Sequence, residues 1–115
     1  MGEDERRRDP RLPLHFEAEV RFASWEVMRL LYTVNISRGG MNVELPRRPT
    51  PGATLNVKLH PPSGPIIELE AVVRHISPVE NDPTQMRCYV GVEFRDLDDV
   101  KRSSIEMLLD GTWGR

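Results

Sequence analysis

The segment Asn35-Ile36-Ser37-Arg38-Gly39-Gly40 separates two apolar runs in the first half of the chain. Residues 27–34, before it, are rich in aliphatic and β-branched side chains, and residues 41–45, after it, alternate between apolar and polar. Small polar residues and glycines between such runs are typical of a turn. The pattern therefore predicts two strands joined by a polar turn, with room for a bulge in the first strand.

Four further segments have an apolar residue at every second position, as expected for half-buried strands. These segments are residues 15–22, 55–59, 67–76 and 88–94. Stretches rich in proline, glycine or polar residues separate them. Six short strands with regularly spaced turns are typical of an antiparallel β-barrel.

The last segment has a different period and predicts a helix. Asp98 can cap its N-terminus, and Gly111 is a plausible stop. At helical spacing one face carries Val100, Ser104, Met107 and Leu108, with Ile105 and Leu109 beside it. The predicted fold is mainly β: a six-stranded antiparallel β-barrel of the split-barrel type, with a C-terminal α-helix as a lid.

The N-terminal segment is charged, contains prolines and shows no apolar periodicity. We expect residues 1–13 to form a flexible basic arm and residues 14–115 to form a single domain. Arg6, Arg7 and Arg11 supply planar, permanently charged groups that suit phosphate oxygens or a guanine edge. The turn at 35–40 supplies neutral hydrogen-bonding groups and accessible backbone amides. Together the two segments indicate a site for a phosphorylated, base-containing ligand.

The composition excludes several classes of protein. A net charge of −2 over 115 residues argues against a general polyanion binder, so any attraction for phosphate must be local. The one cysteine, Cys88, excludes a disulfide framework and is expected to be a small core residue. No apolar run is long enough for a membrane span, and we expect a cytoplasmic protein.

The sequence offers little for catalysis or metal binding. His15, His60 and His75 have no paired spacing with cysteines or carboxylates, so no metal site is expected. Ser37 could be imagined in a catalytic triad, but the chain has neither a GxSxG elbow nor an α/β pattern. We therefore expect a binding protein rather than an enzyme.

Three motifs in this order match a known family. Arg7-Arg8-Asp9-Pro10-Arg11 fits an RxxxR signature, and Arg6 completes a common arginine doublet. Asn35, Ser37 and Gly40 fit a [D/N]xSxxG signature, and Gly91-Val92-Glu93-Phe94 is similar to the usual last strand. Over nearly its whole length the chain resembles a stand-alone PilZ domain, the bacterial receptor module for cyclic di-GMP.

The resemblance implies roles for individual residues. Arg7 and Arg11 would hold phosphates and guanine edges of cyclic di-GMP, and Arg6 is compatible with a stacked pair of ligand molecules. Asn35 and Ser37 would hydrogen-bond guanine or phosphate, and Gly40 would leave room for the backbone to close on the ligand. The predicted ligand-binding residues are Arg6, Arg7, Arg11, Asn35, Ser37, Arg38, Gly39 and Gly40.

The expected mechanism is a switch rather than a reaction: the dianionic ligand would order the arginine arm, and a protein partner would read the ordered arm. One alternative is an adaptor that keeps the fold and works without ligand in motility or surface-related regulation. Another is a small barrel that binds nucleic acid, which is disfavoured because aromatic residues make up only 6% of the chain.

Overall fold

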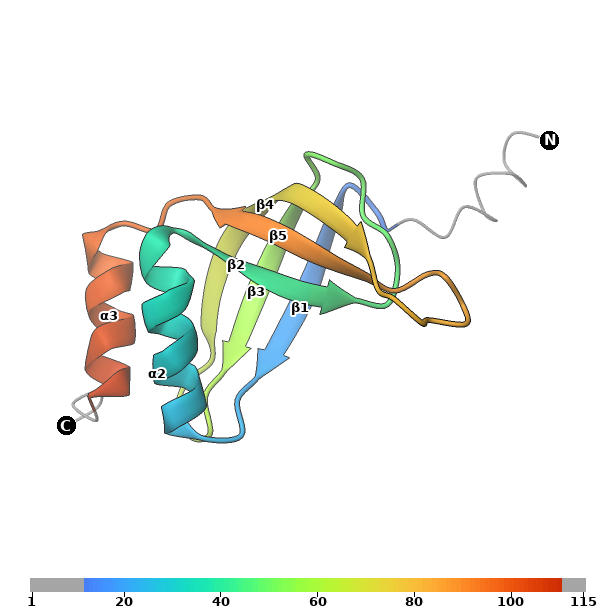
Figure 1. The fold of residues 1–115 in the computed structure, drawn as a ribbon. Helices are drawn as coiled ribbons and strands as arrows, with labels where there is room; N and C mark the ends of the chain where they lie inside the picture. The colour runs from blue at the N-terminus through green and yellow to red at the C-terminus, as the bar shows by residue number, and fades with distance from the viewer. Residues whose placement is uncertain (1–11, 111–115) are drawn as a thin grey trace.

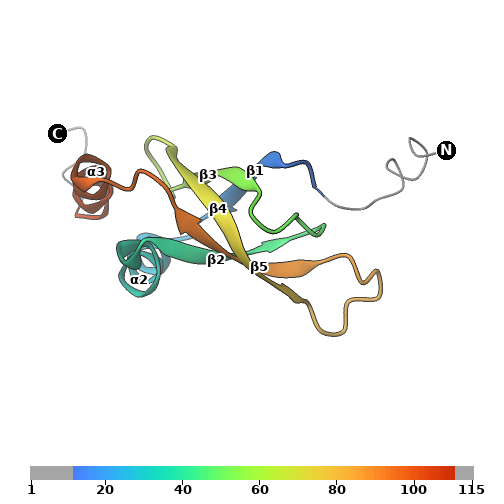
Figure 2. The ribbon, with the colours of Figure 1, turned by 90° about the horizontal axis from the view of Figure 1, so that it is seen from above.

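The computed structural model describes residues 12–110 as one curled β-sheet with two helices at one end (Figures 1 and 2). In chain order its elements are β1 (His15–Arg21), α2 (Trp25–Val34), a 3-10 turn (Ile36–Arg38), β2 (Gly40–Leu45), β3 (Thr54–His60), β4 (Ile67–Pro78), β5 (Cys88–Phe94) and α3 (Asp99–Leu109). Five of the predicted segments are strands, and the predicted C-terminal helix is confirmed.

The sheet has the strand order β1-β3-β4-β5-β2 and is mixed rather than antiparallel. β1 runs parallel to β3, with His15 opposite Thr54, whereas the other neighbouring pairs are antiparallel. The chain crosses from β1 at one edge to β2 at the other before β3 returns beside β1. The sheet curls into a half-barrel between these two edges, so the prediction of six strands in a purely antiparallel barrel was wrong.

The missing strand is the segment 27–34, which forms helix α2 instead. The Ser24 hydroxyl accepts a hydrogen bond from the Val27 amide at 3.2 Å and caps the helix. Met28 is fully buried, and Trp25, Leu31 and Tyr32 pack against the core. These residues share one face only at the helical period, so burial of that face favours the helix over a strand.

The core lies inside the curl of the sheet and under the two helices. The alternation read from the sequence is confirmed: the strands turn one set of side chains inward, including Leu55, Val57, Leu69 and Val90, all at most 1% exposed. Cys88 is also buried, as expected for a small core residue. Burial raises the pKa of the Cys88 thiol, which keeps it protonated and unreactive.

Helix α3 begins at the predicted cap, where the Asp98 carboxylate accepts a hydrogen bond from the Lys101 amide at 2.9 Å. Its buried face consists of Ile105, Leu108 and Leu109. Val100, placed on that face by the sequence, is 74% exposed because the helix packs along its C-terminal half. Gly111 lies outside the described residues. Neither α2 nor α3 has the length and apolar content that a bilayer crossing requires.

Candidate functional site

The turn at 35–40 joins helix α2 to strand β2, not two strands as predicted. Ile36 is fully buried and anchors the turn in the core. Gly39 has φ +94°, a left-handed conformation that glycine adopts without strain. The Phe94 amide donates a hydrogen bond to the Gly39 carbonyl at 2.7 Å and ties the turn to the end of β5.

Gly40 is required by a close approach between two strands. A Cβ atom at this position would lie 2.6 Å from the carbonyl oxygen of Val92 on β5. A side chain there would push β2 away from β5 at the point where the turn enters the sheet. The two glycines therefore serve different purposes: Gly39 permits the turn, and Gly40 permits the contact that holds it.

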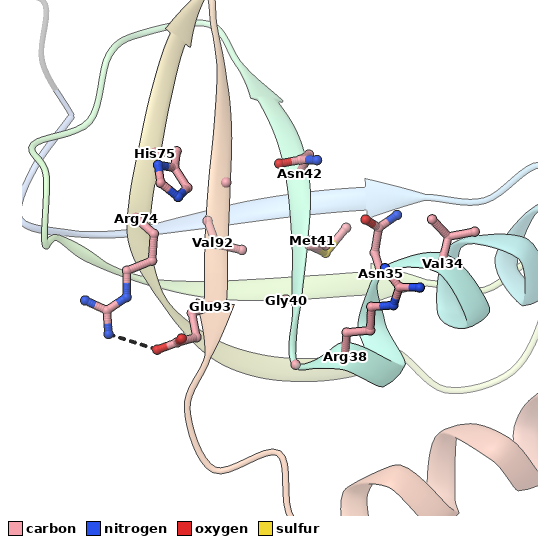
Figure 3. A pocket seen from close by; sticks show the side chains of 12 residues that line it. Val34, Asn35, Arg38, Gly40, Met41, Asn42, Arg74, His75, Val92 and Glu93 are labelled. Carbon is pink, nitrogen blue, oxygen red and sulfur yellow. Dashed lines mark hydrogen bonds and ion pairs between the residues drawn. The ribbon is translucent and has the colours of Figure 1, made fainter.

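A pocket of about 350 Å³ opens beside this turn on the outer face of β2, β5 and β4 (Figure 3). Asn35 and Arg38 lie on one rim, Arg74 and His75 lie on the other, and β2 and β5 form the floor between them (Figure 3). Its lining residues are Val34, Asn35, Arg38, Gly39, Gly40, Met41, Asn42, Arg74, His75, Gly91, Val92 and Glu93. Four of the eight predicted residues are thus brought together: Asn35, Arg38, Gly39 and Gly40.

Ser37 belongs to the turn but does not line the pocket. Its hydroxyl donates a hydrogen bond to the Thr33 carbonyl at 3.1 Å, closing the C-terminal end of α2. Arg6, Arg7 and Arg11 lie outside the described residues. The described chain begins at Leu12, whose amide donates to the Arg48 carbonyl at 2.9 Å, just beyond the end of β2.

The residues that β4 and β5 contribute to the pocket were not predicted from the sequence. Gly91 is paired with Asn42 on β2 and with His75 on β4, and it leaves the centre of the floor flat. A Cβ at Gly91 would approach the Asn42 Oδ1 atom to 3.2 Å. Gly91 was visible in the Gly91–Phe94 motif, but its neighbours depend on strand register, which single-strand patterns do not reveal.

Arg74 reaches the pocket through an irregularity in β4. The register between β4 and β5 shifts between Val73 and His75, so Arg74 is the extra residue of a bulge. Its Nη2 atom lies 2.9 Å from Oε1 of Glu93, and both side chains are more than half exposed. This ion pair is therefore weak and can be exchanged for a stronger anion such as a phosphate.

The charge of the pocket favours an anion. Arg38 has no hydrogen-bond or ion-pair partner for its side chain among residues 12–110, whereas Arg74 is balanced by Glu93. In the same part of the chain, no group of histidine, cysteine or acidic side chains is arranged to hold a metal ion. The site thus offers guanidinium groups, an amide side chain, an imidazole and exposed backbone over a flat floor, which suits a planar, negatively charged ligand.

Residues 5–111 match the family model of the PilZ domain. This chain belongs to the PilZ family. The match includes both the arginine run and the turn at 35–40, and PilZ domains are binding modules for cyclic di-GMP rather than catalytic domains. A search of curated proteins found no significant match.

Proposed function

We propose that this PilZ domain is a receptor that binds cyclic di-GMP in the pocket beside Asn35–Gly40, with Arg7 and Arg11 completing the site. The observation that carries the proposal is the pocket itself. It gathers four residues of the turn at 35–40, and among residues 12–110 the Arg38 side chain has no hydrogen-bond or ion-pair partner.

The ligand's chemistry matches the groups present. Cyclic di-GMP has two phosphodiester charges and two guanines, whose O6 and N7 atoms accept a bidentate bond from arginine. Arg38 and Arg74 are positioned for such contacts, and Asn35 can discriminate a base edge from a bare anion. The floor at Gly91 carries no side chain and leaves space for a purine ring.

Simple lengths support a role for the arginines before Leu12. Strand β2 has six residues and is about 20 Å long, and Leu12 is bonded at its far end, next to Arg48. An extended chain covers about 17 Å between residues 12 and 7. If the N-terminal segment runs back along β2, the Arg7 side chain reaches the turn at 35–40, while Arg11 stays near Leu45. The two arginines would then hold opposite ends of one ligand.

The signal, in this proposal, is the ordering of the arginine segment before Leu12 over the domain and its recognition by a protein partner. Ordering backbone costs about 1–2 kcal/mol per residue. Charge-assisted hydrogen bonds contribute about 1.5–3 kcal/mol each, so several must form at once. The arm can therefore respond to a dianion that engages several arginines together, and a single charge is not enough.

Calorimetric titration with cyclic di-GMP tests the proposal. We expect the wild type to bind and Arg7→Ala, Arg11→Ala and Asn35→Ala each to weaken binding by about tenfold or more. Arg47→Ala is the matched control, because it removes the same charge from an exposed loop residue outside the pocket. Binding by the arginine variants as tight as that of the wild type would refute the assignment of the arm to the site.

A further inference from the structure

Two backbone hydrogen bonds lie within the turn at 35–40. The Asn35 carbonyl accepts from the Arg38 amide at 3.0 Å, and the Ile36 carbonyl accepts from the Gly39 amide at 2.9 Å. The Ser37 carbonyl is bonded differently. It accepts a hydrogen bond of 2.6 Å from Nη1 of Arg102, a residue on α3 that lies 65 positions further along the chain.

The Arg102 guanidinium bridges two segments. Its Nε atom donates to the Leu97 carbonyl at 3.3 Å, just before α3, while Nη1 holds Ser37. The side chain is half-buried and does not line the pocket. Since a guanidinium is rigid and planar, fixing one nitrogen on Leu97 also sets the direction of the other toward Ser37.

We propose that Arg102 is a positioning residue for ligand binding: it fixes the turn at 35–40 from behind, through the Ser37 carbonyl, without touching the ligand. The proposal rests on the proposed function, because it concerns the same pocket. Ser37 directly precedes Arg38, whose side chain must point into the pocket. A charge-assisted bond to the carbonyl between these residues restricts the rotation of that peptide and so the direction in which Arg38 leaves the backbone.

The coupling between α3 and the ligand must act in both directions. If α3 orients the turn for the ligand, then the ligand must stabilise the docking of α3 by the same free energy. Helices α2 and α3 are joined by polar contacts: the Tyr32 hydroxyl donates to Glu106 Oε1 at 2.7 Å, and Arg29 Nε donates to the Leu109 carbonyl at 3.2 Å. Helix α3 is therefore a second element, besides the N-terminal segment, that would respond to ligand in the pocket.

Three variants separate positioning from general stability. Arg102→Met keeps the aliphatic stem but removes both hydrogen bonds. Tyr32→Phe loosens the same helix interface without touching the turn, and Lys101→Met removes a neighbouring charge from α3. Each is compared with the wild type in two measurements: the amide resonances of Gly39 and Gly40 in the free protein, and the affinity for cyclic di-GMP at several salt concentrations.

We expect Arg102→Met to shift the Gly39 and Gly40 resonances and to weaken ligand binding about tenfold, which corresponds to ~1.4 kcal/mol. Its salt dependence should equal that of the wild type, because no contact to a phosphate is lost. The two control variants should keep wild-type resonances at the turn and wild-type affinity. Equal loss of affinity in Tyr32→Phe, or a flatter salt dependence in Arg102→Met, would overturn the proposal.

The free-protein resonances also separate this inference from the proposed function. Unchanged Gly39 and Gly40 resonances in Arg102→Met would show that Arg102 does not position the turn, whatever the ligand. If the wild type does not bind cyclic di-GMP but Arg102→Met still shifts the Gly39 and Gly40 resonances, the proposed ligand is refuted and the role of Arg102 in positioning the turn remains.

Discussion

Two polar loops of this domain differ in what holds their backbones. The loop between β4 and β5 is tied locally: the Asp82 carboxylate accepts hydrogen bonds from the amides of Thr84, Met86 and Arg87, all within five residues. The turn at 35–40 is tied from a distance, by Phe94 at the end of β5 and by Arg102 on α3.

The loops also differ in which side chains remain available to a ligand. In the loop at 79–87 the Asp82 carboxylate is engaged in holding the loop itself, and Arg87 forms an ion pair with Glu44 on β2. In the turn at 35–40 distant residues hold the backbone, so the Asn35 and Arg38 side chains remain directed to the pocket. A self-contained loop connects strands, whereas a turn supported by the rest of the domain can present its polar groups to a ligand.

The largest expected effect concerns the anchor of the turn. Ile36 is fully buried, so Ile36→Ala should lower the free energy of unfolding by about 2–5 kcal/mol through the cavity it leaves. Val79, in the other loop, is only half-buried, and Val79→Ala should cost less than about 1 kcal/mol. Chemical denaturation of both variants measures the difference, and equal costs would mean that the two loops are equally integrated.

The next largest effect on stability is expected at Gly40, with Gly39 as the comparison. Gly40→Ala should cost about 1–3 kcal/mol, because its Cβ would press on the Val92 carbonyl. Gly39→Asn is the matched control: no atom lies within 4 Å of the added Cβ, and asparagine tolerates the left-handed conformation. A thermal or denaturant melt in which Gly39→Asn is the more damaging change would contradict the close-approach explanation for Gly40.

The sequence predicted the strands well because their alternation is a local property. Segment 27–34 was misread because Val27, Leu30 and Val34 are exposed and apolar, which hides the amphipathic pattern that Met28 and its neighbours create. Ser24, the helix cap, was the available signal. The parallel pairing of β1 with β3 was also not predicted, because a strand's own pattern does not identify its neighbour.

The site residues that lie close together in the sequence were predicted, and those brought in by tertiary structure were not. Asn35, Arg38, Gly39 and Gly40 lie within one six-residue segment, so the sequence pattern identified them together. Arg74, His75 and Gly91 enter the pocket through the register of three strands and a bulge, and Arg102 acts on the turn from α3. Such relations depend on tertiary structure and leave no pattern in one segment.

The contact between the helices predicts a pH effect at high pH. Burial and the Glu106 carboxylate raise the pKa of Tyr32 to about 12 from its usual 10.0. The folded state therefore holds the phenolic proton more tightly than the unfolded chain does, and its stability should fall as the pH rises from 10.0 to about 12. Unfolding measured across this range should show less of this fall in Tyr32→Phe, and identical curves would argue against the Tyr32–Glu106 contact.

The smallest expected effect lies in the loop at 79–87. Hydrogen bonds from backbone amides, that of Arg87 first, lower the pKa of Asp82 below its usual 3.8. This contribution to stability is present above pH 3.8 and should be lost as the pH falls through the lowered value. Asp82→Asn should flatten the acid limb of the stability curve and leave the affinity for cyclic di-GMP unchanged. Loss of ligand affinity in this variant would mean that the two loops are coupled.

The central claim is that the turn supported from a distance, and not the self-contained loop, contacts the ligand. The most direct test follows backbone amide resonances during a titration with cyclic di-GMP. We predict progressive shifts at Gly39, Gly40 and Gly91, with residues 82–87 unmoved. A saturable response confined to residues 82–87, or no response near Gly40 up to millimolar ligand (a binding free energy of about 4 kcal/mol), would contradict the claim.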